Sequence, residues 1–346
     1  MSRMDLINLR SDTQTLPTAA MLDAMRNAPL GDDVFGEDPT VAKLESMAAK
    51  MLGKEAAMLV ISGTMGNLVS LMAHANPGDE VIVDPEAHIF YYEGGSMSAV
   101  AGLMPMPVPS CDGMLDPDKV AAAIRKPNIH FPIPRLLCLE NTHNRSGGRV
   151  VPLDLHKRLC AVAKEHGLAV HLDGARIFNA SIAAGVPASA YAEDVDSVMF
   201  CLSKGLSCPL GSVVVGSAQF IEKTRRCRKR IGGGMRQAGI IAAAGIVALE
   251  TMIDRLADDH ATAKALAQGL SDVPGFNIDL DKVETNMVYV DHSGTGLSTE
   301  DMLSRLKSVS ILASGSPPNR IRFVTNRHHD MATIEEAVRR IRTLFF

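Results

Sequence analysis

The sequence predicts an α/β protein with a doubly wound, mostly parallel central sheet, followed by a smaller C-terminal α+β domain. Short apolar runs alternate with helical patterns up to about residue 260, and within these runs there is no alternation with polar residues. Strands that helices cover on both faces have such continuous apolar sequences. After that point the order of the elements changes. We therefore expect a large domain over residues 1–258, N-terminal segment included, and a small domain over 259–346.

The expected strands of the large domain are short and rich in Val, Ile, Leu or Met. They are Ala57–Ile61, Glu80–Asp84, Leu136–Glu140, Leu168–Asp173, Ser197–Leu202 and Ser212–Val215. The helical patterns between them are Thr40–Leu52, Thr64–Ala73, Pro117–Arg125, Leu153–His166 and Ala218–Arg228. Asp116 followed by Pro117 is typical of an N-cap with proline in the first turn. Pro105–Pro109 is expected to be an extended connection.

One long helix, from Met235 to about Ala267, is expected after the sheet region. The small domain should then contain strands and helices in a less regular order. The strands are Asn286–Val290, Ile311–Ala313 and Arg320–Thr325, and the helices are Thr299–Ser308 and Thr333–Leu344.

The composition is that of an ordinary globular protein. Of 346 residues, 46% are hydrophobic and 21% are charged, and the net charge is −4. This balance gives no general attraction to nucleic acid or to an anionic membrane. The six cysteines form no CxxC pair, which indicates free thiols. Because neither a signal peptide nor an apolar membrane span is visible, we expect a cytoplasmic protein.

The segment Ser62–Asn67 joins an expected strand to an expected helix and is a candidate phosphate site. Gly63 lets backbone N–H groups approach an anion, Thr64 adds a hydroxyl donor, and a helix N-terminus favours negative charge. The same residues are compatible with a plain tight turn and an N-cap. The segment has neither the Gly-Lys-Ser/Thr of a Walker loop nor a GxGxxG string.

Asp173 and Lys204 stand at the ends of two consecutive expected strands. Ligands bind at the carboxyl edge of a parallel sheet, and an acid placed there can hold a positively charged ring nitrogen. Lys204 interrupts an apolar stretch, and burial lowers a lysine pKa, as a Schiff-base nucleophile requires. Taken singly, Asp173 could be a helix cap and Lys204 a surface residue.

The three features together fit one cofactor, pyridoxal 5'-phosphate (PLP). This cofactor needs a phosphate cup, a carboxylate opposite its pyridine nitrogen and a lysine for its aldehyde. The turn at Gly63, the acid Asp173 and the amine of Lys204 supply these groups in chain order.

Over essentially the whole chain the sequence resembles the threonine aldolases, within the fold type I (aspartate-aminotransferase-like) PLP enzymes. The strings that carry the resemblance are Leu9–Thr13, Gly31–Gly36, Asp38–Thr40, Ser62–Asn67, Ala87–His88, Glu140–Asn144, His171–Arg176, Leu202–Leu206, Gly232–Gln237 and Thr285–Met287. Two of them, Glu140–Asn144 and Gly232–Gln237, separate this group from generic aminotransferases. The resemblance implies a carbon–carbon lyase that cleaves L-threonine, L-allo-threonine and related L-β-hydroxy-α-amino acids to glycine and an aldehyde.

The resemblance also implies how the cofactor is held. Lys204 carries PLP as a Schiff base, Gly63 and Thr64 bind the phosphate, and Asp173 pairs with the pyridine nitrogen. His88 lies against the face of the ring, because aldolases of this kind place a histidine there.

The substrate carboxylate needs a cationic fork, which arginine supplies in bidentate form. Arg322 matches the C-terminal arginine of the family, Arg176 is the second candidate beside the cofactor, and Ser11 joins them. Arg236 is expected to reach the cofactor phosphate of a neighbouring subunit. The resemblance implies a homo-oligomer, a dimer at least and commonly a tetramer built as a dimer of dimers, with sites at the subunit interface.

The base that removes the β-hydroxyl proton is His143, His88 or a water held by a histidine, and we favour His143. An imidazole suits this task because its unperturbed pKa is about 6.5. With the carboxylate fixed by arginines, the Cα–Cβ bond can stand perpendicular to the cofactor ring and break. Phe35 replaces the tyrosine usual in the family, so contacts to the β-hydroxyl are expected to differ.

Two other functions fit parts of the sequence. One is another PLP reaction on the same scaffold, an aminotransferase, racemase or β-eliminating lyase, against which Glu140–Asn144 and Gly232–Gln237 argue. The other is a non-catalytic PLP-binding protein, which the intact site residues and the absence of any DNA-binding module disfavour. No metal site is expected, since no histidines have a recognisable metal-site spacing.

Overall fold

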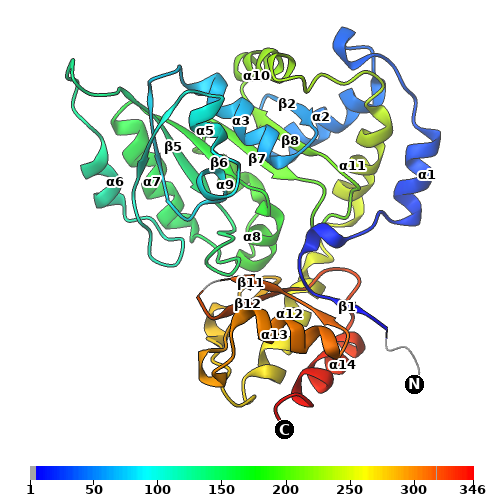
Figure 1. Ribbon diagram of the computed structural model, residues 1–346. Helices are drawn as coiled ribbons and strands as arrows, with labels where there is room; N and C mark the ends of the chain where they lie inside the picture. Colours follow the sequence, from blue (N-terminus) through cyan, green and yellow to red (C-terminus); the bar gives the residue numbers. More distant parts are fainter. Residues whose placement is uncertain (1–4, 317) are drawn as a thin grey trace.

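A seven-stranded sheet is the centre of the large part of the molecule, in a computed structural model that describes residues 5–316 and 318–346 (Figure 1). Its strands in spatial order are β2 (Ala56–Val60), β8 (Ser212–Gly216), β7 (Ser197–Cys201), β6 (Ala169–Asp173), β5 (Pro134–Glu140), β3 (Glu80–Val83) and β4 (Met104–Pro107). Only β8 runs antiparallel to its neighbours among these strands. The expected mostly parallel sheet is therefore confirmed.

Helices cover both faces of this sheet. They are α1 (Ala19–Asn27), α2 (Pro39–Leu52), α3 (Gly63–His74), α4 (His88–Tyr91), α5 (Ser96–Ala99), α6 (Pro117–Ala123), α7 (Leu153–Glu165), α8 (Ile177–Ala184), α9 (Ala188–Ala192), α10 (Ala218–Arg230) and α11 (Gly239–Thr251). Leu137 and Leu139 of β5 pack into one apolar core, whereas Leu136 and Cys138 pack into another. Successive side chains of one strand are thus buried on opposite faces, which explains why these strands are apolar throughout.

The small part of the molecule has its own apolar core. It contains β1 (Ile7–Asn8), β9 (Met287–Asp291), β10 (Ile311–Leu312), β11 (Ser314–Ser316), β12 (Arg320–Val324), α12 (Leu256–Leu270), α13 (Thr299–Ser308) and α14 (Met331–Arg342). The antiparallel strands β11, β12 and β9 form one sheet, and β1 pairs in parallel with β10. Within the described residues, no helix is long and apolar enough to cross a membrane.

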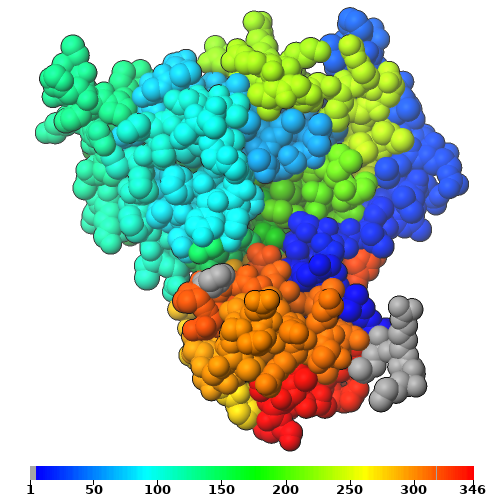
Figure 2. Space-filling model, in the orientation of Figure 1, coloured from blue at the N-terminus to red at the C-terminus, as the bar shows by residue number. Residues whose placement is uncertain are grey.

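The N-terminal segment connects the two parts. Ile7 and Leu9 are buried in the small core, although we grouped this segment with the large domain. Figure 2 shows the segment, in blue, lying across the junction between the large part and the small part in orange and red. Ile7 pairs with Ile311 in the parallel strand pair, which a sequence pattern of two residues cannot reveal.

Two other elements differ from expectation. The segment Pro105–Pro109, expected as a connection, overlaps the edge strand β4, where prolines are tolerated because one side needs no N–H donor. The long helix expected from Met235 is two helices, α11 and α12, interrupted at residues 252–255. Leu256 packs in the core of the large part and Ala263 in the small core, so the chain passes from one core to the other here.

Asp38 stabilises the start of α2 and fixes its contact with α11. Its Oδ1 accepts from the N–H groups of Thr40 and Val41 at 3.0 Å each, and its Oδ2 accepts from Gly239 N at 2.8 Å. We expect Asp38→Ala to lower the free energy of unfolding by about 3 kcal/mol, because a cap and buried charge-assisted hydrogen bonds are lost together. Thermal denaturation would measure this, with the exposed Glu37→Ala as the control.

Candidate active site

Three candidate residues, together with Glu140 of the string Glu140–Asn144, lie where strands of the large sheet end at one edge. Asp173 ends β6, Glu140 ends β5, and Lys204 follows β7 by three residues. Gly63 follows β2, which runs in the same direction as β7 because both are antiparallel to β8. This is the carboxyl edge of the parallel strands, where ligands bind in open α/β sheets.

A cavity of about 370 Å³ opens at this edge, between the large sheet and the small antiparallel sheet. Lys204 and His88 line it together with the expected carboxylate ligands. The full lining is Ser11, Thr13, His88, Tyr92, Asn144, Arg145, Arg176, Lys204, Tyr289, Ser314, Gly315, Ser316 and Arg322. The structure therefore brings residues from both ends of the chain into one cavity.

The turn at Gly63 begins α3 and can receive an anion. Ser62 is the N-cap, and its hydroxyl accepts from Met65 N at 3.2 Å. A Cβ added at Gly63 would lie 2.9 Å from the sulfur of Cys201, so a larger residue does not fit between this turn and the end of β7. Thr64 is exposed beside it. The turn thus combines the N-terminus of α3, a close approach to the end of β7 and the hydroxyl group of Thr64.

Asp173 is buried, with 1% of its surface exposed. Its Oδ1 accepts from Ala175 N at 3.1 Å and its Oδ2 accepts from Asn67 Nδ2 at 2.8 Å. Ring and carboxylate atoms of His88, Glu93 and Asp173 lie within 4.8 Å of one another. The acid expected opposite a pyridine nitrogen is therefore adjacent to the histidine that lines the cavity.

His88 is held by two carboxylates. Its Nδ1 lies 2.9 Å from Glu93 Oε1, and its backbone N–H donates to Glu140 Oε2 at 2.5 Å. Burial lowers the pKa of His88, but the hydrogen bond to Glu93 and the charge of Asp173 outweigh it, so that its pKa is raised. When the ring is neutral, Nδ1 donates to Glu93 and Nε2 remains an acceptor.

The two expected arginines meet at Asn144. Arg176 Nη1 lies 3.5 Å from Asn144 Oδ1, and Arg322 Nη1 donates to the same oxygen at 3.1 Å. Glu140 Oε1 accepts from Asn144 N at 2.7 Å, so one buried carboxylate positions both this bridge and His88. The first and last residues of the string Glu140–Asn144 therefore both have structural roles beside the cavity.

Arg176 and Arg322 differ in what they can offer a substrate. Arg176 donates from Nε and Nη2 to the two oxygens of Asp12, at 2.7 Å each, which leaves only Nη1 for another acceptor. Burial raises the pKa of Asp12, but Arg176 outweighs it and the pKa falls to about 2. Arg322 Nε is buried and has no hydrogen-bond partner among the described residues. Arg322 is therefore the stronger candidate for a carboxylate, and Arg176 supports it.

Five expected site residues do not line the cavity in this chain: Gly63, Thr64 and Asp173, which lie at the same edge of the sheet, and His143 and Arg236. His143 is buried, with Nε2 3.2 Å from Asp84 Oδ2 and Nδ1 2.8 Å from Ser146 Oγ, so both ring nitrogens face protein groups. Arg236 is on the surface, 3.0 Å from Asp32. Phe35 is 73% exposed. The roles given to His143 and Arg236 stay predictions, and the preference for His143 over His88 loses its support.

Five residues that the structure brings to the site received no role from the sequence: Asp12, Asn67, Glu93, Glu140 and Asn144. Four of them lie inside strings that carry the family resemblance, so position in a motif was a usable signal. Glu93 lies in no such string. Its only signal was an acid among small and aromatic residues five positions after His88.

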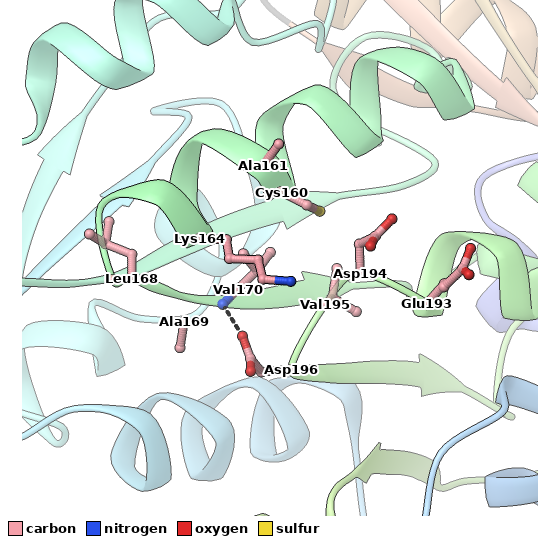
Figure 3. A pocket seen from close by; sticks show the side chains of 11 residues that line it. Cys160, Ala161, Lys164, Leu168, Ala169, Val170, Glu193, Asp194, Val195 and Asp196 are labelled. Atoms are coloured by element: carbon pink, nitrogen blue, oxygen red, sulfur yellow. Dashed lines mark hydrogen bonds between the residues drawn. The ribbon is translucent and has the colours of Figure 1, made fainter.

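A larger cavity, about 640 Å³, lies at the opposite edge of the sheet, beside the end of α7 and the start of β6 (Figure 3). Its charged side chains, Lys164, Glu193, Asp194 and Asp196, are exposed to solvent. Asp196 Oδ2 accepts from Val170 N at 2.7 Å. None of the buried unpartnered polar atoms found among the described residues lines it. Size alone therefore does not make this cavity the functional one.

Comparisons with known proteins agree with this geometry. Residues 8–293 match the family described as beta-eliminating lyases. Low-specificity L-threonine aldolase 1 of Arabidopsis thaliana is 47% identical over 335 residues, covering 95% of this chain and 93% of the plant protein.

Two solved structures share the fold. The threonine aldolase of Leishmania major has a TM-score of 0.83 at 19% identity, covering 98% of this chain and all of that chain. A structure of SPT with PLP has a TM-score of 0.76 at 20% identity, covering 98% of this chain and 87% of the other. With nearly half of its residues shared with the Arabidopsis enzyme along almost its full length, the chain belongs to the threonine aldolase family.

Proposed function

We propose that this protein is a PLP-dependent aldolase that cleaves L-threonine, L-allo-threonine and related L-β-hydroxy-α-amino acids to glycine and an aldehyde. The observation that carries the proposal is one cavity that combines Lys204, His88 and the unpartnered Nε of Arg322. A lysine, a base and a carboxylate fork are the groups that retro-aldol cleavage of an amino acid requires.

The residues at the sheet edge fit PLP. Gly63 and Thr64 would hold the phosphate at the start of α3, Asp173 would pair with the ring nitrogen, and Lys204 would bind the aldehyde. When bound, PLP accepts the electrons of the breaking Cα–Cβ bond. His88, which lines the cavity within 4.8 Å of Asp173, would lie against the ring.

Arg322 orients the substrate by its carboxylate. Its free Nε and its Nη2, which lies 3.3 Å from Arg10 O, form the fork, while its Nη1 stays against Asn144. Arg176 adds Nη1 from the other side of Asn144. Ser11 lines the same cavity, although its hydroxyl already accepts from Thr13 N at 3.2 Å. Fixing the carboxylate in this way fixes the direction of the Cα–Cβ bond.

His88 is the proposed base for the β-hydroxyl proton. It lines the cavity, and with Nδ1 donating to Glu93 its Nε2 can accept a proton. Glu93 then stabilises the imidazolium that forms. This arrangement favours His88 over His143, whose ring nitrogens both face protein groups outside the cavity.

The pH dependence of cleavage tests the link between Glu93 and His88. The pKa of His88 is raised, so the neutral base is lost as the pH falls through a value above 6.5. Glu93→Gln removes the charge that raises this pKa, so the acid limb of kcat should move to lower pH, with a smaller maximal kcat. Glu86→Gln, at an exposed position two residues before His88, is the control. An acid limb that stays in place in Glu93→Gln would exclude His88 as the titrating base.

Product analysis tests the proposed reaction. The purified protein with PLP should release acetaldehyde and glycine in equal amounts from L-threonine and from L-allo-threonine. The matched beta-eliminating lyase family makes elimination the competing outcome, which would give 2-oxobutanoate and ammonia instead. Those products without acetaldehyde would overturn the aldolase function while keeping the cofactor. The ratio of the two acetaldehyde rates would give the preference at the β-carbon.

We further propose that the protein acts as a homo-oligomer in the cytoplasm, as a tetramer with Arg236 facing the cofactor phosphate of a neighbouring subunit. Arg236 is exposed and Phe35 projects into solvent in the single chain, which is the disposition expected of interface residues. All six cysteines are free, as in a reducing compartment. Sedimentation velocity would give the number of subunits.

A further inference from the structure

A row of five polar side chains runs behind Asp173, away from the cavity. Asn67 Nδ2 donates to Asp173 at 2.8 Å, Asn67 Oδ1 lies 3.0 Å from His171 Nε2, and His171 Nδ1 lies 2.8 Å from Ser197 Oγ. Ser197 Oγ lies 2.7 Å from His74 Nε2. Of these, Asn67, His171 and Ser197 have no exposed surface and Asp173 has 1%.

Secondary structure places these side chains in line. His171 and Asp173 are two positions apart on β6 and so point to the same face of the sheet. Asn67 and His74 are seven positions apart on α3 and so lie on the same side of that helix. Ser197 is the first residue of β7, beside His171 in the parallel pairing. Helix α3 therefore carries both the proposed phosphate turn, at Gly63, and Asn67, the hydrogen-bond partner of Asp173.

The hydrogen atoms of this row can be assigned one residue at a time, starting from Asn67. Asn67 Nδ2 also donates to Glu93 Oε1 at 2.8 Å, so both amide hydrogens of Asn67 point at carboxylates. The amide oxygen must then face His171, which makes Nε2 of His171 the donor. Burial lowers the pKa of His171 to about 3, so the ring is neutral and Nδ1 accepts from the hydroxyl of Ser197.

The same reasoning continues to the last residue. Since the hydroxyl of Ser197 donates to His171, its oxygen accepts from His74 Nε2. Every donor in the row thus points towards Asp173. Turning the Asn67 amide over would place its oxygen between Asp173 and Glu93 and its NH₂ against the N–H of His171, which loses three hydrogen bonds and adds repulsion.

We propose that His171 is a positioning residue for the cofactor: by fixing the orientation of the Asn67 amide, it keeps Asp173 supplied with donors and available as the acceptor for the ring nitrogen. Hydrogen bonds to a carboxylate favour its charged form, and a charged Asp173 favours a protonated ring nitrogen. His171 does not line the cavity, so it is placed to act through Asn67 and Asp173. The inference rests on the proposed function, in which Asp173 faces that nitrogen.

Two substitutions by amides that differ by one methylene group separate this role from a merely structural one. In His171→Gln the amide nitrogen can reach Asn67 as Nε2 does, whereas in His171→Asn the shorter amide reaches only the position of Nδ1, near Ser197. The probe is PLP labelled with ¹⁵N in the ring, bound to the whole enzyme, with the ¹⁵N chemical shift reporting protonation. The dissociation constant of PLP is measured alongside.

We expect a protonated ring nitrogen in the wild type and in His171→Gln, and a smaller protonated fraction in His171→Asn, with kcat for cleavage reduced about 10- to 100-fold. If His171→Asn does not fold, Ser197→Ala carries the comparison, because it releases the tautomer of His171 without removing the ring. A ring signal in these variants identical to that of the wild type would overturn the role of His171 and leave the aldolase function intact. An unprotonated ring nitrogen in an active wild type would overturn the pairing with Asp173, and failure to bind PLP would overturn the proposed function itself.

Discussion

Lys204→Ala is expected to abolish acetaldehyde release from L-threonine, with kcat at least about 10³-fold lower, because among the described residues no other amine lines the cavity. The lysine follows β7 in a tight turn in which Ser207 N and Thr15 Oγ1 both donate to its carbonyl oxygen, at 2.8 and 2.9 Å. The turn is therefore held by backbone contacts that the substitution keeps. Acetaldehyde release and the visible absorbance of the bound cofactor measure the result.

The matched control for Lys204→Ala is Lys223→Ala, which removes a lysine from α10 beside the opposite edge of the sheet. It should keep both the absorbance and the activity. Retention of cleavage in Lys204→Ala, with the absorbance lost, would mean that another group carries the reaction and would reject the assigned lysine.

Arg322→Ala is expected to lower kcat/KM by about 10²- to 10³-fold, mostly through KM, while the absorbance of the bound cofactor is unchanged. Losing two charge-assisted hydrogen bonds to a carboxylate costs about 3–4 kcal/mol, and each 1.36 kcal/mol is a factor of ten. Arg322→Lys should recover only part of this loss, because an ammonium group cannot form the bidentate fork. Steady-state kinetics with L-threonine measure all three enzymes.

Arg320→Ala is the control for Arg322, since Arg320 lies on the same face of β12 but lines a neighbouring cavity, 5.2 Å from the ring centre of Tyr289. Its kcat/KM should stay within a few-fold of the wild type. Equal losses in Arg320→Ala and Arg322→Ala would mean that general positive charge, and not a fork at Arg322, attracts the carboxylate.

The sequence was sufficient to predict the central sheet and the residues at its edge. The strands before Gly63, Asp173 and Lys204 are mostly apolar, and the end of a parallel strand fixes where the next residue lies. The positions of these three residues depend only on the local apolar pattern of each strand and on the rule that ligands bind at the carboxyl ends of parallel strands. This is why the fold class and the relation between these three residues could be stated without coordinates.

The partners of site residues could not be predicted in the same way. Whether His143 or His88 is available as a base depends on Asp84, which reaches His143 from another segment of the chain, and on Glu93, which bonds to His88 from beyond the end of α4. Arg176 was expected to serve the cofactor and the substrate, but two of its three nitrogens are bonded to Asp12, 164 positions earlier. Such pairings follow from tertiary packing, for which a single sequence has no periodic signal.

The contacts of the N-terminal segment determine when, during synthesis of the chain, the fold can be completed. Ile7 pairs with Ile311, Leu9 O accepts from Val324 N, and Asp12 holds Arg176, so residues 7–12 are tied both to C-terminal strands and to the large part of the molecule. A chain still emerging from the ribosome can form much of the large sheet, but neither β10 nor Arg322 exists until synthesis is almost finished. Lys204 is therefore translated before Arg322, and the cavity that both residues line cannot be complete until the last part of the chain has been made.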